Sequence, residues 1–280
     1  MLRLLVQHRR ELATYFATKC EVRDMQLCGI STLLLASMFG YLEIVQALLG
    51  RGADVDRNSA FGSTALHEAS MKGHIEVVRA LLSAGADVSK SDNADRAALH
   101  FASREGHIEV VRALLEARTG VDVRKCDEDG ISPITYASWK KNIELYVTLV
   151  EAGGEVDKLD SDGWTVLHDA SQSGFIEGVR YLLGRGANVN KSASNVGGHT
   201  PLTLASYCGR LEVVRALLEA GASVDKRDGE DETPLSRALM VKFWHTKRDR
   251  VGKVKVAVLL TEVGKQLANI SATRSSSAPN

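Results

Sequence analysis

The stretch from Gly73 to Leu82 reads GHIEVVRALL, and the same residues return unchanged at 106–115, 33 residues later. The tripeptide Ala-Leu-His, which precedes this stretch at 65–67, is likewise repeated at 98–100. A fixed period near 33 residues indicates a stack of short units, each of which packs only against its neighbours. The period therefore predicts the architecture before any single residue is considered, and it predicts a protein that works through a long continuous surface.

The period continues in both directions along the chain. Alignment on the third residue of Ala-Leu-His gives successive intervals of 33, 33, 35, 33, 35 and 33 residues between anchors at Leu34, His67, His100, Thr135, His168, Thr203 and Ser236. The longer intervals place their extra residues in connecting loops at 116–129 and 184–197. A stack tolerates insertions in one kind of loop because its helices keep their register.

Each unit reads as two short helices joined by a tight turn. In the second unit Ile75, Val78, Leu81 and Leu82 cover one side of the second helix. A glycine such as Gly73 separates the two helices in most units, because the turn needs a positive φ. In the fourth unit a Lys-Asn pair replaces Gly-His at 141–142. We therefore predict that this unit is the weak point of the stack, by about 1 kcal/mol.

The first helix of each unit carries its own starting signal. Thr200-Pro201 and Thr233-Pro234 place a hydroxyl at the N-cap and proline at the first helical position. Ala97 lacks that hydroxyl in the third unit, so its first helix is expected to be less well capped. A serine near the end of each first helix is interpreted as a small residue needed for close helix packing; these serines are Ser37, Ser70, Ser103, Ser138, Ser171 and Ser206.

These residues carry a resemblance to the ankyrin-repeat family, whose motif is G-x-T-P-L-H-x-A, then G-H, then V-x-x-L-L-x-x-G-A. Its best matches here are GSTALHEAS from Gly62, GWTVLHDAS from Gly163 and GHTPLTLAS from Gly198. The resemblance covers 26–226 as six repeats, and 227–265 as a degenerate seventh, capping repeat with an insertion. It implies an all-α solenoid of paired antiparallel helices with exposed β-turn or hairpin loops.

The two ends of the chain depart from the motif. Residues 1–25 fit either an N-terminal capping helix or a truncated repeat, and whether Met1 is the natural start of the chain stays open. The polar segment 266–280 is expected to be disordered.

Charge and composition exclude several function classes. The chain has 35 basic and 35 acidic residues, and this balance argues against nucleic acid as the main partner. One local basic cluster, interrupted by an aspartate, is interpreted as a solvated loop; it consists of Lys247, Arg248, Arg250, Lys253 and Lys255. No apolar run is long enough to span a membrane, so no membrane association is expected.

The cysteines and the N-terminal residues bear on the compartment. Cys20, Cys28, Cys126 and Cys208 are scattered without Cys-x-x-Cys spacing, which fits reduced thiols in a cytoplasmic or nuclear protein. The arginines near the N-terminus suggest a mitochondrial presequence as an alternative, against which Glu11 counts.

The histidines and cysteines give no catalytic arrangement. His67, His74, His100 and His107 occupy motif positions where the ankyrin family uses histidine for hydrogen bonds, so no metal site is expected. Neither Cys126 nor Cys208 has a base partner that the sequence can place, and both are interpreted as structural thiols. We therefore expect no catalytic residue, no cofactor and no enzyme activity.

Asn190 ends a Gly-Ala-Asn-Val-Asn run. In related ankyrin repeats an asparagine at this turn can be hydroxylated by an oxygen-dependent dioxygenase, so one interpretation is that Asn190 is modified. The other interpretation, which we prefer, is that Asn190 is an unmodified turn residue.

The resemblance also places a binding face. In the family, non-motif residues of the loops and first helices line a concave surface. Carried over one by one, these positions are Phe61, Glu68, Met71, Arg96, Phe101, Arg104, Tyr136, Trp139, Trp164, Asp169, Gln172 and Tyr207. Six of the twelve are aromatic although the whole chain is 5% aromatic, and interfaces favour aromatic residues at their centres. The alternative for Phe101 and Tyr136 is that they pack inward between first helices.

Two functions compete on this basis. The first is a monomeric binding module or scaffold that recognises another protein on the concave face. The second is the substrate-recognition adaptor of a larger complex, such as a ubiquitin ligase, although 265–280 contains no recognisable recruitment box. Neither reading identifies the partner, because a fold alone does not specify one.

Overall fold

The computed structural model describes residues 31–117, 121–153, 156–160, 163–194, 197–240 and 247–276. Within these ranges every regular element is an α-helix, apart from one isolated bridge between Ser91 and Ala97. The predicted all-α class is confirmed. The expected element at 1–25 lies outside the described residues, as do Cys20 and Cys28. The chain divides into two compact units between Ala152 and Gly153, and each unit is described by itself.

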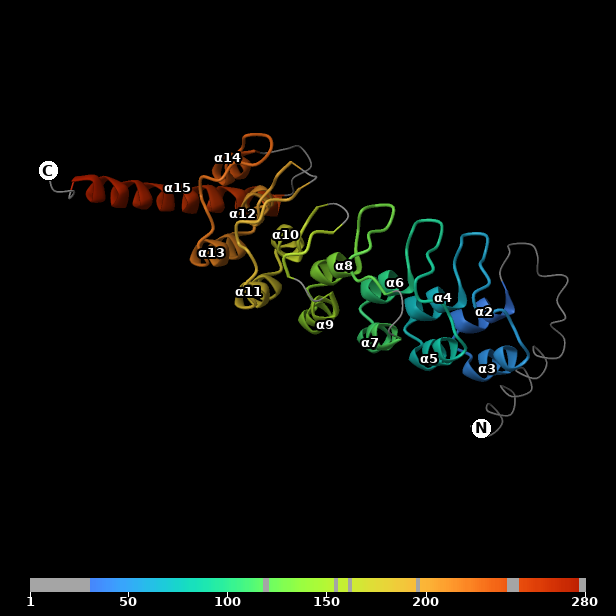
Figure 1. Ribbon diagram of the computed structural model, residues 1–280. Coiled ribbons are helices and arrows are strands. Elements are labelled where there is room, and N and C mark those ends of the chain that lie inside the picture. The colour runs from blue at the N-terminus through green and yellow to red at the C-terminus, as the bar shows by residue number, and fades with distance from the viewer. Residues whose placement is uncertain are drawn as a thin grey trace, which may run out of the picture. The chain divides into compact units, whose positions relative to one another are not determined.

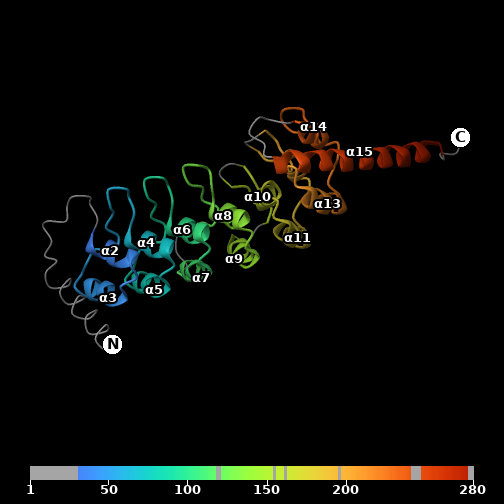
Figure 2. The same cartoon turned by 180° about the vertical axis from the view of Figure 1, so that it is seen from behind.

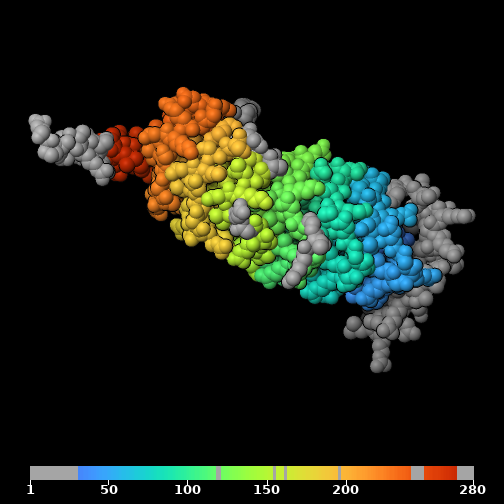
Figure 3. Space-filling view, viewed as in Figure 1, coloured from blue at the N-terminus to red at the C-terminus, as the bar shows by residue number. Residues whose placement is uncertain are grey.

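Unit 1 contains four helix pairs. They are α2 (Thr32–Met38) with α3 (Leu42–Gly50), α4 (Ala65–Lys72) with α5 (Ile75–Ser83), α6 (Ala98–Glu105) with α7 (Ile108–Glu116), and α8 (Pro133–Lys140) with α9 (Ile143–Gly153). The first helices α2, α4, α6 and α8 pack side by side in one layer, and the second helices form the other layer (Figure 1). Loops between successive pairs project from the same edge of this unit. In the space-filling view each repeat of the unit abuts the next (Figure 3).

Unit 2 repeats this arrangement with three pairs. They are α10 (Val166–Ser173) with α11 (Ile176–Gly184), α12 (Pro201–Tyr207) with α13 (Leu211–Glu219), and α14 (Pro234–Leu239) with α15 (Lys247–Ser276). Helix α14 packs against α12, while α15 packs against α13 and α14 (Figure 2). The last pair therefore covers the end of this unit with the same two-layer geometry.

Helix α15 differs from two sequence expectations. It includes the basic cluster interpreted as a solvated loop, and Lys253 of that cluster is buried. It also runs to Ser276, well into the segment 266–280 that was expected to be disordered. The sequence between Gly264 and Pro279 contains no further helix breaker, so a helix that starts against the repeats can continue.

The core lies between the two helix layers. Equivalent valines of successive second helices, such as Val45, Val78 and Val111, are fully buried. The predicted N-caps are confirmed at Thr200 and Thr233, whose hydroxyls accept N–H groups of the first turn. Ser132 caps α8 in the same way. The burial of apolar side chains against the next repeat therefore supplies most of the cohesion.

The tight turns between paired helices also match the sequence reading. Gly73 ends α4 in the left-handed conformation at φ 74°. Lys141 takes the same conformation at φ 53° after α8, as predicted from its place in the motif. A side chain with a Cβ is strained in this region, so the fourth repeat carries a local penalty that its neighbours avoid.

Candidate recognition surface

Buried histidines join the first helix of their repeat to the loop that follows it through hydrogen bonds. The Nδ1 atom of His67 accepts the main-chain N–H of Thr64 at 2.9 Å, and its Nε2 donates to the carbonyl of Lys90 at 3.0 Å. His100 bonds in the same way to the N–H of Ala97 and the carbonyl of Lys125. Burial lowers the pKa of both rings, so both are neutral, and each links its helix to the following loop through hydrogen bonds.

A second set of side chains ties the helix ends together. The Nε2 atoms of His74 and His107 each donate, at 3.2 Å, to a carbonyl at the end of the preceding first helix, Met38 and Met71 respectively. In unit 2, Arg210 occupies the equivalent position and donates from Nε to the carbonyl of Gln172 at 3.0 Å. The histidines therefore make hydrogen bonds within and between repeats, which is the role the family resemblance implied.

Aspartates shape the hairpin loops. One oxygen of Asp92 accepts the N–H groups of Ala94 and Arg96, while the other accepts two N–H groups of the Arg96 guanidinium at 2.9 and 2.7 Å. Asp127 accepts two main-chain N–H groups and the hydroxyl of Tyr136 at 3.1 Å. These contacts hold the loops rigid beside the first helices.

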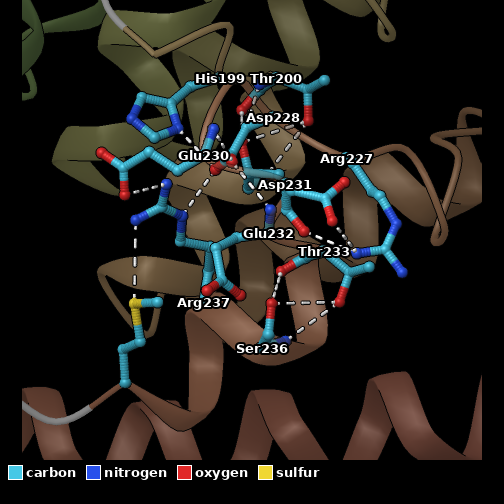
Figure 4. A network of polar contacts seen from close by, with 12 residues as sticks. His199, Thr200, Arg227, Asp228, Glu230, Asp231, Glu232, Thr233, Ser236 and Arg237 are labelled. Carbon is cyan, nitrogen blue, oxygen red and sulfur yellow. Dashed lines mark hydrogen bonds and ion pairs between the residues drawn. The ribbon is translucent and has the colours of Figure 1, made fainter.

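The last loop contains the densest polar network (Figure 4). Asp228 accepts Nε of Arg237 at 2.6 Å, and it contacts Nδ1 of His199 at 3.0 Å. Arg237 also donates to Glu230 at 3.0 Å. Burial raises the pKa of Asp228, but the hydrogen bonds from Arg237 and from main-chain N–H groups outweigh it and hold that pKa below its usual value. This network fixes α14 on the last hairpin.

The predicted face residues of unit 1 differ in exposure. Phe61 and Trp139 are the most exposed, at 73% and 49%. Four others are half-buried; they are Glu68, Met71, Arg96 and Arg104. Phe101 is buried, which agrees with the inward-packing alternative and not with a place on an exposed face. The guanidinium groups of Arg96 and Arg104 lie 4.9 and 5.5 Å from the centre of its ring, and the ring of His67 contacts it edge to face.

Helix α8 presents the main aromatic pair of unit 1. The rings of Tyr136 and Trp139 meet edge to face, with centres 5.7 Å apart. Tyr136 is half-buried, and its hydroxyl is held by Asp127. Burial and the neighbouring Asp127 raise the pKa of Tyr136, so it stays a neutral donor. The exposed Trp139 ring is thus supported by a side chain that is itself fixed.

The predicted residues of unit 2 are mainly structural. Asp169 is buried, which differs from its placement on an exposed face. Trp164 is half-buried against His168, and Gln172 and Tyr207 are half-buried. The Tyr207 ring lies 4.3 Å from Nζ of the buried Lys253. This ring therefore helps to seat α15.

The sequence analysis placed Arg104 on the binding face but missed two other basic residues of unit 1, Lys72 and Lys140. All three lie in the last turns of first helices, Lys72 in α4, Arg104 in α6 and Lys140 in α8. The signal was present, because each lies one or two residues before the turn position that ends its helix. Their side-by-side placement follows only from the packing of the three helices.

The described residues offer little for metal or thiol chemistry. Within the described ranges, no three His, Cys, Asp or Glu side chains gather as a metal site. Cys126 and Cys208 are not in disulfide bonds, and burial raises the pKa of Cys208, which makes it a poor nucleophile. None of the described helices combines the length and the apolar character that a membrane span requires.

Asn190 bridges two neighbouring loops of unit 2. Its side-chain oxygen accepts the N–H of Ser223 at 2.8 Å, and its Nδ2 donates to the carbonyl of Gly221 at 3.2 Å. Its carbonyl accepts Nζ of Lys226. The side chain thus has a structural role, while its hydroxylation stays an untested prediction.

The family described as "Ankyrin repeats (3 copies)" matches at residues 33–125, 117–193 and 134–228, which together span most of the chain. The chain belongs to the ankyrin-repeat family. Among solved structures, the ankyrin repeat domain of Bcl-3 aligns with a TM-score of 0.66 and 28% identity, covering 81% of this chain and 99% of that one. The human ASB11 ankyrin repeat domain gives 0.64 and 25% identity, covering 80% and 98%.

The relatives found by sequence match over part of this chain and over less than half of their own length. Mouse ankyrin repeat and SAM domain-containing protein 6 is 40% identical over 77 residues, covering 27% of this chain and 8% of that protein. Mouse Rabankyrin-5 is 31% identical over 185 residues, covering 66% and 13%. Mouse protein phosphatase 1 regulatory subunit 27 is 33% identical over 75 residues, covering 27% and 47%. The chain thus spans less than half the length of each of these relatives.

Proposed function

We propose that this ankyrin-repeat protein recognises another protein through one surface of unit 1, the α4–α8 face. We define this face by Phe61, Met71, Arg104, Tyr136 and Trp139. Ankyrin repeats are protein–protein interaction modules, and a stack of first helices offers a continuous surface for a partner. The proposed role is binding, without catalysis by this chain.

The observation that carries the proposal is the support of Trp139. Its ring is 49% exposed, yet it is braced edge to face by Tyr136, whose hydroxyl is held by Asp127. An exposed aromatic side chain that is already ordered loses little conformational freedom on binding. Tryptophan, tyrosine and arginine are also the residue types that most often dominate interface energetics.

The test compares the intact chain with a Trp139→Ala variant. Partners captured by the wild-type chain are identified by mass spectrometry, and the affinity of a purified partner is then measured by titration. We expect Trp139→Ala to weaken binding by about 2 kcal/mol, which is roughly thirtyfold. Ile143→Ala is the control, because Ile143 is 41% exposed but lies at the start of α9 in the other helix layer. Equal affinities for wild type and Trp139→Ala would exclude this face.

A second candidate is an adaptor that presents one protein to a larger complex. It is favoured by the similarity to a relative named as a regulatory subunit of protein phosphatase 1. An adaptor requires two partners bound at once, so it needs a second surface besides the α4–α8 face. Ternary-complex formation, measured by size-exclusion chromatography with two purified partners, distinguishes it from a simple binding module.

A further inference from the structure

A row of basic side chains borders the α4–α8 face. Lys72, Arg104 and Lys140 lie in the last turns of three first helices that pack side by side. Lys141 follows directly in the left-handed turn. Only Glu105 interrupts the row, so these five positions carry a net charge of +3 from four basic residues and one acidic residue.

Two of the four basic side chains have no ion pair within the described part of unit 1. Lys72 and Lys140 are exposed and form no ion pair with any residue in the described part of the chain. Arg104 pairs with its neighbour Glu105 at 3.0 Å, but both side chains are more than one-third exposed. Such a surface pair is weak, and a partner carboxylate can replace it.

Two of the three nearest acidic residues are paired with other side chains. Each of the second helices α5, α7 and α9 has one glutamate in its first turn, namely Glu76, Glu109 and Glu144. Two of them pair with arginines of the second-helix layer, Glu76 with Arg79 at 3.3 Å and Glu144 with Arg112 at 2.8 Å. These pairs occupy two of the three glutamates, and Glu109 is the one member of the three without an ion pair in the described part of the chain. One acidic residue of that layer therefore stands against the four basic residues.

A purely structural role does not account for the row. Basic residues at helix C-termini complement the helix dipole. If that were their function, every first helix would be expected to carry one, yet the last turns of α2, α10 and α12 contain none. In α14 the basic residue is Arg237, which is buried against Asp228. The exposed basic residues are thus confined to the three helices that carry Met71, Arg104 and Trp139.

From this arrangement we infer that the partner of the α4–α8 face is an acidic protein segment in which carboxylates alternate with apolar side chains. Carboxylates would pair with Lys72, Arg104 and Lys140, while apolar side chains would pack on Met71 and Trp139. Helix spacings of about 8–10 Å place α4 and α8 about 20 Å apart, which an extended segment of about six to eight residues spans. This inference rests on the proposed function.

The test selects ligands without assuming a sequence. The full chain is used to select binders from a phage-displayed library of random peptides, and enriched peptides are synthesised and titrated. We expect them to be net negative and to contain apolar residues. Their affinity should fall at least about tenfold in Lys72→Glu/Lys140→Glu, and it should weaken as the ionic strength rises. Lys72→Gln/Lys140→Gln should give a smaller loss in the same direction.

The matched control reverses two charges outside the face. Arg180 and Arg215 are exposed residues of the second helices α11 and α13, so Arg180→Glu/Arg215→Glu should leave peptide affinity unchanged. Circular dichroism and the melting temperature establish that each variant is folded.

The outcomes separate the two proposals. Peptides that need Trp139 but are neutral or basic, and ignore the lysine substitutions, would overturn the acidic partner while supporting the face. Peptides that bind Trp139→Ala as well as wild type, or no enrichment at all, would overturn both. A single-stranded DNA oligonucleotide that binds more tightly than the peptides, and loses affinity in the same lysine variant, would replace the protein segment with nucleic acid.

Discussion

The Nε2 atom of His168 donates a hydrogen bond to the main-chain oxygen of His199, 3.0 Å away in the next repeat. The Nδ1 atom of the same ring accepts the N–H of Thr165 at 3.1 Å. The ring is therefore held neutral with its proton on Nε2. Burial is the main reason why the pKa of His168 falls from 6.5 to about 4, so protonation of this ring opposes folding.

We predict that the free energy of unfolding falls as the pH is lowered from about 6.5 to about 5, the upper part of the range between the unfolded and the folded pKa of His168. Because the folded-state pKa lies below the unfolded value, the stabilisation is fully present above about pH 6.5 and is lost as the pH falls toward about 4. His168 alone should contribute about 2 kcal/mol to this change. His168→Thr, which introduces the residue found at Thr135 and Thr203, should be less stable at neutral pH and show a shallower pH dependence. Urea denaturation measures both, and an identical slope in the two proteins would contradict the assignment.

The strained turn of the fourth repeat gives a second prediction. Lys141→Gly should stabilise the protein by about 1 kcal/mol, because glycine adopts the left-handed conformation without a Cβ penalty. Gly106→Ala is the reverse control: its φ is 85° and no atom lies near the position of the added Cβ, so only backbone strain changes. Hydrogen exchange of the wild type should show faster opening near 139–156 than near 106–115. Equal protection of the two segments would show that the strain is absorbed elsewhere.

The motif serines give a third prediction. Ser70 and Ser103 are fully buried, and their hydroxyls have no hydrogen-bond partner. Ser70→Ala and Ser103→Ala should therefore leave stability unchanged or raise it by up to about 1 kcal/mol, because alanine keeps the small volume without a buried polar atom. Ser132→Ala is the contrasting variant. Its hydroxyl caps α8 by accepting the N–H of Thr135, so its loss should destabilise by about 1 kcal/mol.

The network of the last hairpin gives a fourth prediction. Arg237→Met should destabilise unit 2 by about 3 kcal/mol, since it removes the guanidinium that pairs with the buried Asp228 carboxylate and leaves only His199 and main-chain N–H groups beside it. Adding Asp228→Asn should recover part of this loss, because the uncompensated charge is then removed. The exposed pair of Arg215 and Glu212 is the control, and Arg215→Ala should change the unfolding free energy by less than about 0.5 kcal/mol. A similar cost for the single and double variants would argue against charge as the cause.

Much of the fold could be read from the sequence because it is written in local, repeated signals. Thr200 and Thr233, each followed by a proline, predict the N-termini of two helices, and the structure confirms both. Lys141 revealed a strained turn because it stands where other repeats have glycine. The histidines were interpreted as hydrogen-bonding residues from their motif positions, and His67 and His100 make such bonds.

The exposure of the face residues could not be read in the same way. The first helices of successive repeats turn equivalent positions toward the loops. Whether a side chain at such a position is buried depends on which neighbouring side chains cover it. Two guanidinium groups, those of Arg96 and Arg104, lie over the ring of Phe101, which is buried, whereas Trp139 meets the ring of Tyr136 edge to face and stays half exposed. Asp169 is buried as well, and no local sequence pattern predicted its burial.

The sequence by itself thus determined the repeat period, the helix pairs, their caps and the hydrogen-bonding histidines, since each depends on residues within one or two adjacent repeats. Tertiary structure alone decided which residues meet across repeats. It brought Lys72, Arg104 and Lys140 together on three neighbouring helices, and it buried Lys253 beneath Tyr207 although its sequence neighbours read as a charged loop. The physical reason is that these residues lie more than 30 positions apart in the sequence, so the distances between them are set by the stacking of the repeats.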